Sequence, residues 1–429
     1  MKLTVFQSAD GDCLLVTGRD GTNILVDGGR RTSFETYAAP TLSQLDFLDL
    51  VCLSHIDSDH IAGILQFFDD LFDWRVFDYQ QVSGNNGFPA PASPRPPVVC
   101  GVWHNSFKDQ VAENSEAIEG QLVANARVLN MDASVIGEGL TALGPVASGL
   151  ATSVRESLSL ASRLSAGELG IPVNREFGGK AIFLDSQPLL FPLGDLHLYL
   201  LGPFKADLEK QRLDWNTWLK RNQDVVEELR REAEQDAEQL PISEGDMVLS
   251  YMRSLATALG EREAVTPPNL ASIMLLVEED GKRLLLTGDG HADDIIKGLR
   301  LHGLLDDQDR LHVDALKVQH HGAEFNITKT FCETITADDY VFCGDGAHEN
   351  PDLEVLQTLI DSRLALQDGP AAGRPFKLWF SGSTQNAATA SRREHMRQVE
   401  QLVRSACHNS NGRIDSHFLT RASHLTIWV

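Results

Sequence analysis

The chain has 429 residues, of which 42% are hydrophobic and 23% are charged, as is usual for a soluble globular protein. Its formal net charge of −24 disfavours a nucleic-acid binder, because such proteins carry a basic patch for phosphate groups and no basic stretch occurs here. No apolar stretch approaches the roughly 18 residues that span a membrane, and no signal-peptide pattern opens the chain, so we expect a cytoplasmic protein without a membrane partner.

Residues 1–65 alternate between strand and turn patterns. Turns are expected at Asp10-Gly11-Asp12 and at Arg19-Asp20-Gly21, and the second is a hairpin signal. The next apolar run, Ile24-Leu25-Val26, ends in Asp27. Residues 47–53 then read as a buried strand, followed by a polar loop and the start of a helix.

That polar loop is the most informative segment of the chain. His55, Asp57, Asp59 and His60 place four side chains that can bind a metal within six residues. Imidazole and carboxylate ligands together suit zinc, manganese or iron. A polar helix cap is the competing interpretation, but four such side chains directly after a core strand favour a metal loop.

The middle of the chain mixes strands with two segments of helical character. The apolar run Val98–Trp103 reads as a strand and ends in His104, and strands return over residues 181–203. Residues 110–170 have apolar side chains at helical spacing, and residues 205–265 begin with a charged amphipathic helix. We interpret 110–170 and 205–265 as helical insertions within a single domain that spans residues 1–429.

From residue 270 onward the strand pattern resumes. Residues 273–277 and 283–287 form a second hairpin that ends in Gly288-Asp289. Residues 313–318 read as a strand that ends in His320-His321-Gly322, and a further strand covers residues 340–343. The remaining expected elements are helices over 351–362 and 388–406 and a closing strand over 425–429.

Every strongly polar cluster therefore follows a predicted strand. If these strands are neighbours in one sandwich, their carboxyl ends meet at one edge and the polar side chains converge. A dinuclear hydrolytic site needs such a set of imidazoles and carboxylates, with one carboxylate between the metals and an open position for water.

Six motifs in chain order resemble the metallo-β-lactamase superfamily, in particular the branch that includes ComEC-type DNA-uptake proteins and phosphorylcholine-esterase-like hydrolases. They are Gly11-Asp12-Cys13, Val26-Asp27-Gly28-Gly29, Ser54-His55-x-Asp57-x-Asp59-His60-Ile61-Ala62-Gly63, Asn269-x-x-Ser272, Leu286-Thr287-Gly288-Asp289 and Leu316-Lys317-Val318-x-His320-His321-Gly322. The resemblance implies an α/β fold, the αββα sandwich of the metallo-β-lactamases, with helical insertions.

The resemblance also implies a set of metal ligands. His55 and Asp57 resemble ligands of a first metal, Asp59 and His60 resemble ligands of a second, and Asp289 resembles the bridging carboxylate. One of His320 and His321 would complete the second metal, and we assign His320 to it.

The remaining roles follow from the same resemblance. His104 is our choice for the last ligand of the first metal, because His197 lies within a strand and reads as a solvent-facing residue. Asp27 would brace the metal loop. Asp59 is expected to orient or deprotonate the attacking water, and His321, or Lys317, to supply a proton or charge to the leaving group.

Two positions depart from the commoner family pattern. Asp57 stands where a histidine is usual. This carboxylate is a harder ligand than imidazole, so it increases the preference of the site for manganese or iron relative to zinc. After the strand at residue 340, relatives often carry Gly-His-Pro, whereas this chain has His348-Glu349-Asn350-Pro351. His348 is therefore either a substrate-facing group or an ordinary exposed histidine.

We expect a metal-dependent hydrolase with two divalent metal ions, zinc first and manganese or iron as alternatives. A bridging hydroxide would attack a small or medium anionic ester, a phosphoester before a thioester or lactone. A nuclease is the second hypothesis, and the acidic composition argues against it. The third is a partner-binding module that keeps its metal for folding, suggested by Trp215 and Trp218 in the charged helix.

Overall fold

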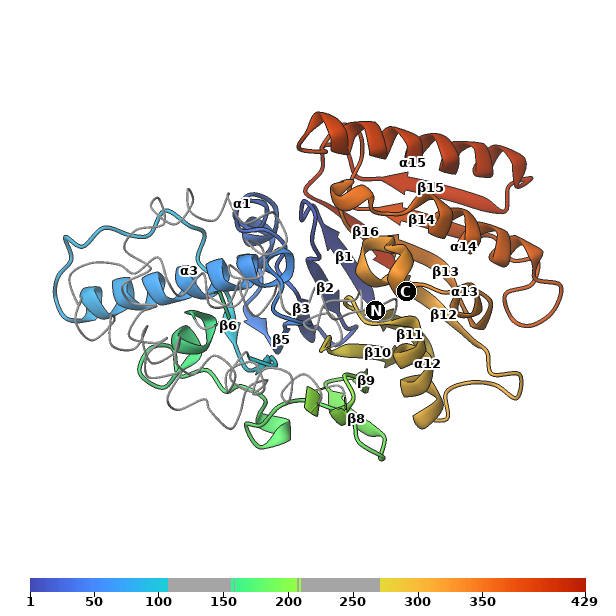
Figure 1. Ribbon diagram of the computed structural model, residues 1–429. Helices are drawn as coiled ribbons and strands as arrows, with labels where there is room; N and C mark the ends of the chain where they lie inside the picture. Colours follow the sequence, from blue (N-terminus) through green and yellow to red (C-terminus); the bar gives the residue numbers. More distant parts are fainter. Residues whose placement is uncertain (107–155, 158, 207, 210–270) are drawn as a thin grey trace, which may run out of the picture.

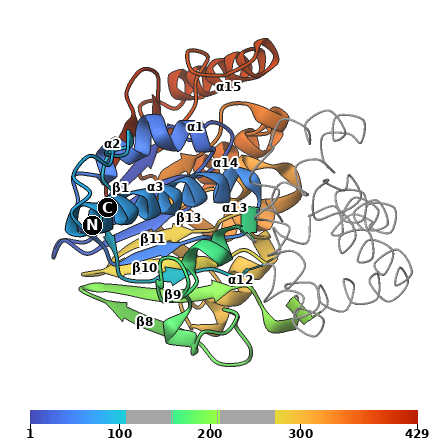
Figure 2. The ribbon, with the colours of Figure 1, turned by 90° about the vertical axis from the view of Figure 1, so that its left-hand side faces the viewer.

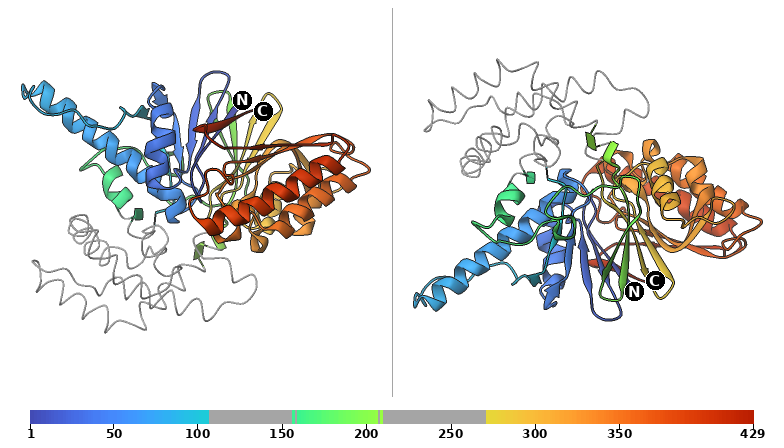
Figure 3. Two further views of the ribbon diagram at one scale, coloured as in Figure 1. Left: turned by 90° about the horizontal axis from the view of Figure 1, so that it is seen from above. Right: turned by 90° about the horizontal axis from the view of Figure 1, so that it is seen from below.

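A computed structural model describes residues 1–106, 156–157, 159–206, 208–209 and 271–429. Two β-sheets pack face to face, and helices cover the outer face of each, as the views in Figure 1 and Figure 3 show. The described residues thus form four layers in the order helix, sheet, sheet, helix.

The first sheet combines the beginning and the end of the chain. Its described strands lie in the order β16-β1-β2-β3-β5-β7, and β3, β5 and β7 run parallel. β2 and β3 form the predicted hairpin. The strands are β1 (Lys2–Phe6), β2 (Leu14–Thr17), β3 (Asn23–Val26), β5 (Leu50–Cys52), β7 (Val102–Trp103) and β16 (His424–Trp428).

The second sheet is built from the later part of the chain. Its described strands lie in the order β15-β14-β13-β12-β11-β10-β9-β8, and β11 to β15 run parallel. They are β8 (Leu189–Leu193), β9 (Leu196–Gly202), β10 (Met274–Glu279), β11 (Lys282–Leu286), β12 (Leu311–Lys317), β13 (Ile335–Phe342), β14 (Phe376–Phe380) and β15 (Ile414–Phe418). β4 (Phe47–Leu48) and β6 (Val98–Val99) pair in parallel and form a separate two-stranded sheet.

The helices divide between the two outer faces, and Figure 2 looks onto the face that α1, α2 and α3 cover. On the first sheet lie α1 (Arg31–Ser33), the π-helix η1 (Phe34–Ala38), α2 (Ala39–Leu42) and the long α3 (Ser58–Val82). On the second sheet lie α12 (Ala292–Leu301), α13 (Lys329–Thr334), α14 (Leu353–Ala365) and α15 (Ala390–Asn409). Short 3₁₀ turns are η3 (Arg175–Phe177), η5 (Gln319–Gly322), η6 (Glu324–Asn326) and η7 (Ala347–Glu349).

Three apolar cores hold these layers together. The central one joins the inner faces of both sheets, for example Val5 and Leu284. A second core packs Ile64 and its neighbours in α3 against the first sheet, and a third packs Leu356 and its neighbours in α14 against the second. Burial of such side chains, at roughly 25 cal/mol per Å² of apolar surface, is the main stabilising term of the sandwich.

The predicted insertions fall largely outside the described residues. Of the segment 110–170, residues 156–157 and 159–170 are described, and 156–157 and 159–164 are helical. Of the segment 205–265, only residues 205–206 and 208–209 are described. The single-domain organisation over residues 1–429 stays a prediction. None of the helices in the described part of the chain is long and apolar enough to cross a membrane.

Candidate metal centre

The predicted site residues lie in loops at one edge of the two sheets. Parallel strands bring their carboxyl ends to the same edge, and β3, β5 and β7 are parallel in one sheet, as are β11 and β12 in the other. The loops after these strands carry Asp27 after β3, residues 54–60 after β5, His104 after β7, Asp289 after β11, and His320 with His321 after β12.

Asp57 occupies the N-cap position of α3, but its side chain makes no capping hydrogen bond to that helix. An aspartate at an N-cap usually accepts a hydrogen bond from the first turn. Its Oδ2 atom lies instead 3.6 Å from Nε2 of His55. The helix-cap interpretation therefore fails for Asp57, whose carboxylate faces the histidine cluster.

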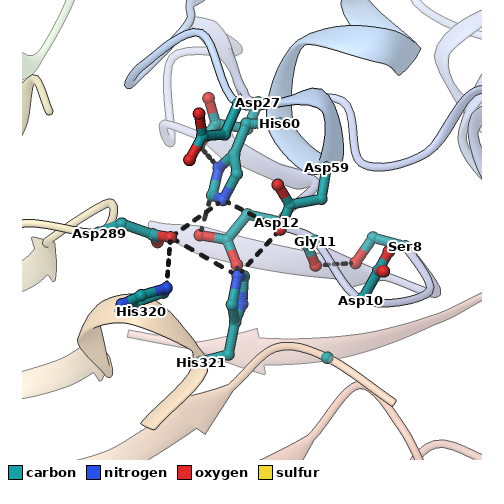
Figure 4. A network of polar contacts seen from close by, with 12 residues as sticks. Ser8, Asp10, Gly11, Asp12, Asp27, Asp59, His60, Asp289, His320 and His321 are labelled. Atoms are coloured by element: carbon teal, nitrogen blue, oxygen red, sulfur yellow. Dashed lines mark hydrogen bonds and ion pairs between the residues drawn. The ribbon is translucent and has the colours of Figure 1, made fainter. Parts of the chain in front are cut away.

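Asp289 contacts several histidines of the cluster, and Figure 4 shows its contacts with His60, His320 and His321. Its side chain is 3% exposed, and its Oδ2 atom faces several imidazole Nε2 atoms. The distances are 3.8 Å to His55, 3.5 Å to His60, 3.7 Å to His320 and 3.7 Å to His321. One carboxylate oxygen among several imidazoles is an arrangement that suits a bridging ligand.

Asp59 faces a different part of the cluster from Asp57. Its Oδ2 atom is 3.8 Å from Nε2 of His60 and 3.3 Å from Nε2 of His321. Asp57 is thus paired with His55, and Asp59 with His60 and His321. These contacts form two overlapping groups of imidazole and carboxylate side chains, with Asp289 in contact with both.

The two adjacent histidines of η5 differ in their surroundings. His321 is buried and lies within reach of both Asp59 and Asp289. The side chain of His320 is 29% exposed, and its Nδ1 atom lies 2.6 Å from Oδ1 of Asn326. The sequence assigned the ligand role to His320, whereas this geometry favours His321.

The imidazoles are held so that one nitrogen of each faces the cluster centre. Nδ1 of His60 lies 2.9 Å from Oδ2 of Asp27, and Nδ1 of His55 lies 3.0 Å from Oγ of Ser54. The Nε2 atoms of His55, His60 and His321 are buried and have no hydrogen-bond partner among the described residues. Buried polar atoms are normally paired. Unpaired nitrogens that converge with carboxylates fit a bound metal ion, and the donor set suits divalent cations.

His104 is buried at the end of β7, and neither of its ring nitrogens has a hydrogen-bond partner within the described part of the chain. Burial lowers its pKa to about 3, so the ring is neutral, which is the form that binds metals. It is not a member of the two compact groups of ligand atoms that the described residues contain, which are Asp12 with His60 and His321, and His55 with His60 and Asp289. Its ligand role stays a prediction.

The electrostatics of the cluster show an excess of negative charge. Burial alone would lower the pKa of His321, but Asp289, Asp12 and Asp59 around it raise the pKa to about 10. Burial likewise opposes ionisation of Asp59, yet the charges of His60 and His321 hold its pKa well below the usual range. The carboxylates therefore favour positive charge in their midst, whether as protons or as metal cations.

Asp12 and Lys317 take part in the cluster in ways that the sequence did not predict. Asp12 precedes β2, and its Oδ1 atom lies 3.3 Å from Nδ1 of His321. Its Oδ2 atom forms an ion pair with Nζ of Lys317, whose side chain is buried. The sequence signal for a role of Asp12 was the motif Gly11-Asp12-Cys13, which lies directly before β2, the strand that pairs with β3.

A second ionic network lies beside the metal cluster. The buried Asp10 accepts hydrogen bonds from Nε of Arg30 at 2.7 Å and from Nη2 of Arg392 at 3.2 Å. Arg392, in α15, also donates to Asp345 at 2.9 Å. A Cβ atom on Gly344 would lie 3.7 Å from the Asp10 carbonyl and 3.5 Å from Cβ of His321, so this network adjoins the histidine loop.

One part of the chain matches a known protein family. Residues 9–72 match the family model described as the metallo-beta-lactamase superfamily. No curated protein matches the chain. Among solved structures, the chain is similar to Zn²⁺-bound PqqB from Methylobacterium extorquens, with 10% sequence identity, a TM-score of 0.33 and coverage of 100% of both chains.

The predicted fold class is confirmed by the family match and by the four observed layers. The ComEC-type or phosphorylcholine-esterase-like branch stays a prediction. Residues 9–72 contain β2, β3, β5 and the start of α3, and so include the loop with His55, Asp57, Asp59 and His60. The chain has the αββα fold, and residues 9–72, which include the loop from His55 to His60, match the model of the metallo-beta-lactamase superfamily.

Proposed function

We propose that this chain is a metal-dependent hydrolase of anionic esters, with a phosphoester as its substrate. The observation that carries the proposal is the convergence of three buried imidazole nitrogens, which make no hydrogen bond within the described residues, with the carboxylates of Asp57, Asp59 and Asp289. Two divalent cations would be held there. The ligands would be His55, Asp57 and His104 for the first, Asp59, His60 and His321 for the second, and Asp289 for both.

Such cations, when bound, lower the pKa of water and stabilise negative charge on a reacting phosphoryl or carbonyl group. The chain's own residues would arrange the reaction around them. Asp59 would accept a hydrogen bond from the attacking water and orient it, because its carboxylate faces the centre of the cluster. Ser54 and Asp27 would keep the imidazoles of His55 and His60 in their orientations.

His320 would contact the substrate in this proposal. Among the four histidines around Asp289, its side chain is the most exposed, at 29%, against 6% for His321 and none for His55 or His60. Asn326 donates from Nδ2 to the Asp289 carbonyl at 2.9 Å, which turns its Oδ1 atom towards His320 and fixes that ring. The sequence-based roles of His320 and His321 are therefore exchanged in the proposal.

Zinc is the first choice of metal, with manganese or iron as alternatives because of the carboxylate-rich ligand set. A small or medium anionic ester fits a site in which cations supply the positive charge that the rest of the chain lacks. The acidic composition argues against the nuclease alternative. The partner-binding alternative rests on Trp215 and Trp218, which lie outside the described residues.

The test is metal content by elemental mass spectrometry, together with turnover of bis-p-nitrophenyl phosphate. We expect about two metal ions per wild-type chain and loss of both metal and turnover in Asp289→Ala. His321→Ala should lose about one metal ion, whereas His320→Ala should keep both and lose turnover. His197→Ala, at an exposed position of β9, is the matched control. A wild-type chain that takes up no zinc, manganese or iron would refute the proposal.

A further inference from the structure

The side chain of Lys317 places a buried ammonium group next to the histidine cluster, in contact with Asp12 and Asp289. Lys317 ends β12, a strand whose neighbours β11 and β13 lie on either side, and its side chain is 1% exposed. Lysine is almost never fully buried unless its charge is paired, because removing an ion from water is costly. We therefore asked which groups stabilise this buried charge and what the charge in turn holds in place.

All three N–H groups of the Lys317 ammonium have partners in the interior. Nζ donates to the carbonyl of Gly288 at 2.9 Å, forms an ion pair with Oδ2 of Asp12, and lies 3.5 Å from Oδ1 of Asp289. An ammonium has three donors and no acceptor. No donor is left for a substrate, so the leaving-group role considered from the sequence does not fit this side chain.

The two carboxylates that Lys317 contacts come from different sheets. Asp12 lies in the β1–β2 loop of the first sheet, and Asp289 follows β11 of the second. Each carboxylate turns one oxygen to Lys317 and the other to a histidine: Asp12 Oδ1 lies 3.3 Å from Nδ1 of His321, and Asp289 Oδ2 lies 3.7 Å from its Nε2. Lys317 thus contacts both carboxylates that flank the imidazole of His321.

We propose that Lys317 is a positioning residue that fixes Asp12 and Asp289, and through them His321, for binding of the second metal ion. The inference rests on the metal centre proposed above. Asp12, His60 and His321 also form a compact group that could bind a cation in another position. Because Lys317 pairs with Asp12, this carboxylate contacts Nδ1 of His321 and orients the ring. In the proposal, Asp12 therefore does not itself bind the metal ion.

The experiment measures cobalt binding by wild type and by Lys317→Met, using a chelator competition and the visible d–d absorption of the loaded protein. We expect the affinity for the second cobalt ion to fall about 10- to 100-fold, with a changed absorption spectrum, while the first ion binds as in wild type. Lys282→Met is the matched control, because Lys282, on the neighbouring strand β11, forms a lysine ion pair with Asp314 of β12 that this variant removes.

Lys317→Met leaves two buried carboxylates without their counter-charge, so a second variant guards against loss of folding. The double variant Lys317→Met/Asp12→Asn removes the ion pair as a unit and should still bind the second cobalt ion at least about tenfold more weakly. Wild-type affinities and spectra in both variants would overturn the role of Lys317. Failure of wild type to bind cobalt would instead refute the metal centre itself, and with it this inference.

Discussion

The close approach of Gly11 to the start of α3, beside the proposed metal centre, predicts that Gly11→Ala will disturb the site. Gly11 lies in the β1–β2 loop, and a Cβ atom placed on it would be 1.6 Å from the carbonyl oxygen of Asp59. An ordinary contact begins near 3.4 Å, so the loop and the start of α3 would have to separate by about 1.8 Å. The two nearest obstructing atoms, the carbonyl oxygen and carbonyl carbon of Asp59, belong to the main chain and cannot turn aside like a side chain.

This separation would act on both sides of the cluster. Asp12 follows Gly11 in the loop, and Asp59 would move with α3. Overpacking of this kind costs about 1–3 kcal/mol of stability. A shift of about 1 Å in catalytic groups can lower turnover by about 100-fold. We therefore expect a lower melting temperature, weaker metal binding and a loss of turnover of that order.

Circular dichroism melting, metal content and turnover of bis-p-nitrophenyl phosphate would measure these effects. Gly87→Ala is the matched control, because a Cβ atom on Gly87 would meet no atom within 4 Å. The control should behave as wild type in all three measurements. If Gly11→Ala keeps wild-type stability and metal content, the loop and helix tolerate separation, and the close approach does not fix the ligand geometry.

Three further predictions concern the support of the site and of the fold. Asp27→Asn should weaken metal binding about 10- to 100-fold in a chelator competition, because Asp27 contacts Nδ1 of His60 and orients its ring. An unchanged metal affinity would show that Asp27 does not orient this ring for binding. Metal removal should lower the free energy of unfolding by about 2.7 kcal/mol relative to protein in a free metal concentration of about 100 times the Kd. Melting temperatures that do not change with metal concentration would contradict this. Burial favours the neutral form of Asp338, but the contact with His312, and after it the charge of Arg374, lower its pKa below 3.8. The stabilising effect of the ionised carboxylate is therefore present above that value and is lost as pH falls through the folded-state pKa. Asp338→Asn should therefore reduce the melting temperature at pH 7 but not at about pH 2, and a difference that is independent of pH would exclude this linkage.

The sequence was sufficient to predict where the site would assemble. Apolar runs that end in histidine or aspartate mark the carboxyl ends of strands, and parallel pairing brings those ends together without further information. The hairpins and the helix expected over 388–406, found as α15, follow equally local signals. Of the strand pattern expected over residues 181–203, the first part, residues 181–184, was wrong, since only an isolated bridge from Leu184 to Phe204 forms there.

The side chains that support the cluster depend on longer-range relations. A lysine in a strand usually faces solvent, but Lys317 is covered by the opposite sheet, and its partner Asp12 is about 300 residues away in sequence. The backbone φ angles of His320 and His321 are 46° and 55°, a region that non-glycine residues seldom adopt. Residue spacing therefore could not tell which of these two imidazoles faces Asp59.

The carboxylate of Asp10, shared by Arg30 and Arg392, has a consequence for how this chain can diverge. A replacement of Arg392 in α15 would deprive Asp10 and Asp345 of a common counter-charge, and both are buried. Tolerated changes at these positions should therefore arise together in homologues, although the residues lie near opposite ends of the sequence. The last long helix, which supplies none of the proposed ligands, is in this way subject to the same evolutionary constraint as the first loop of the metal centre.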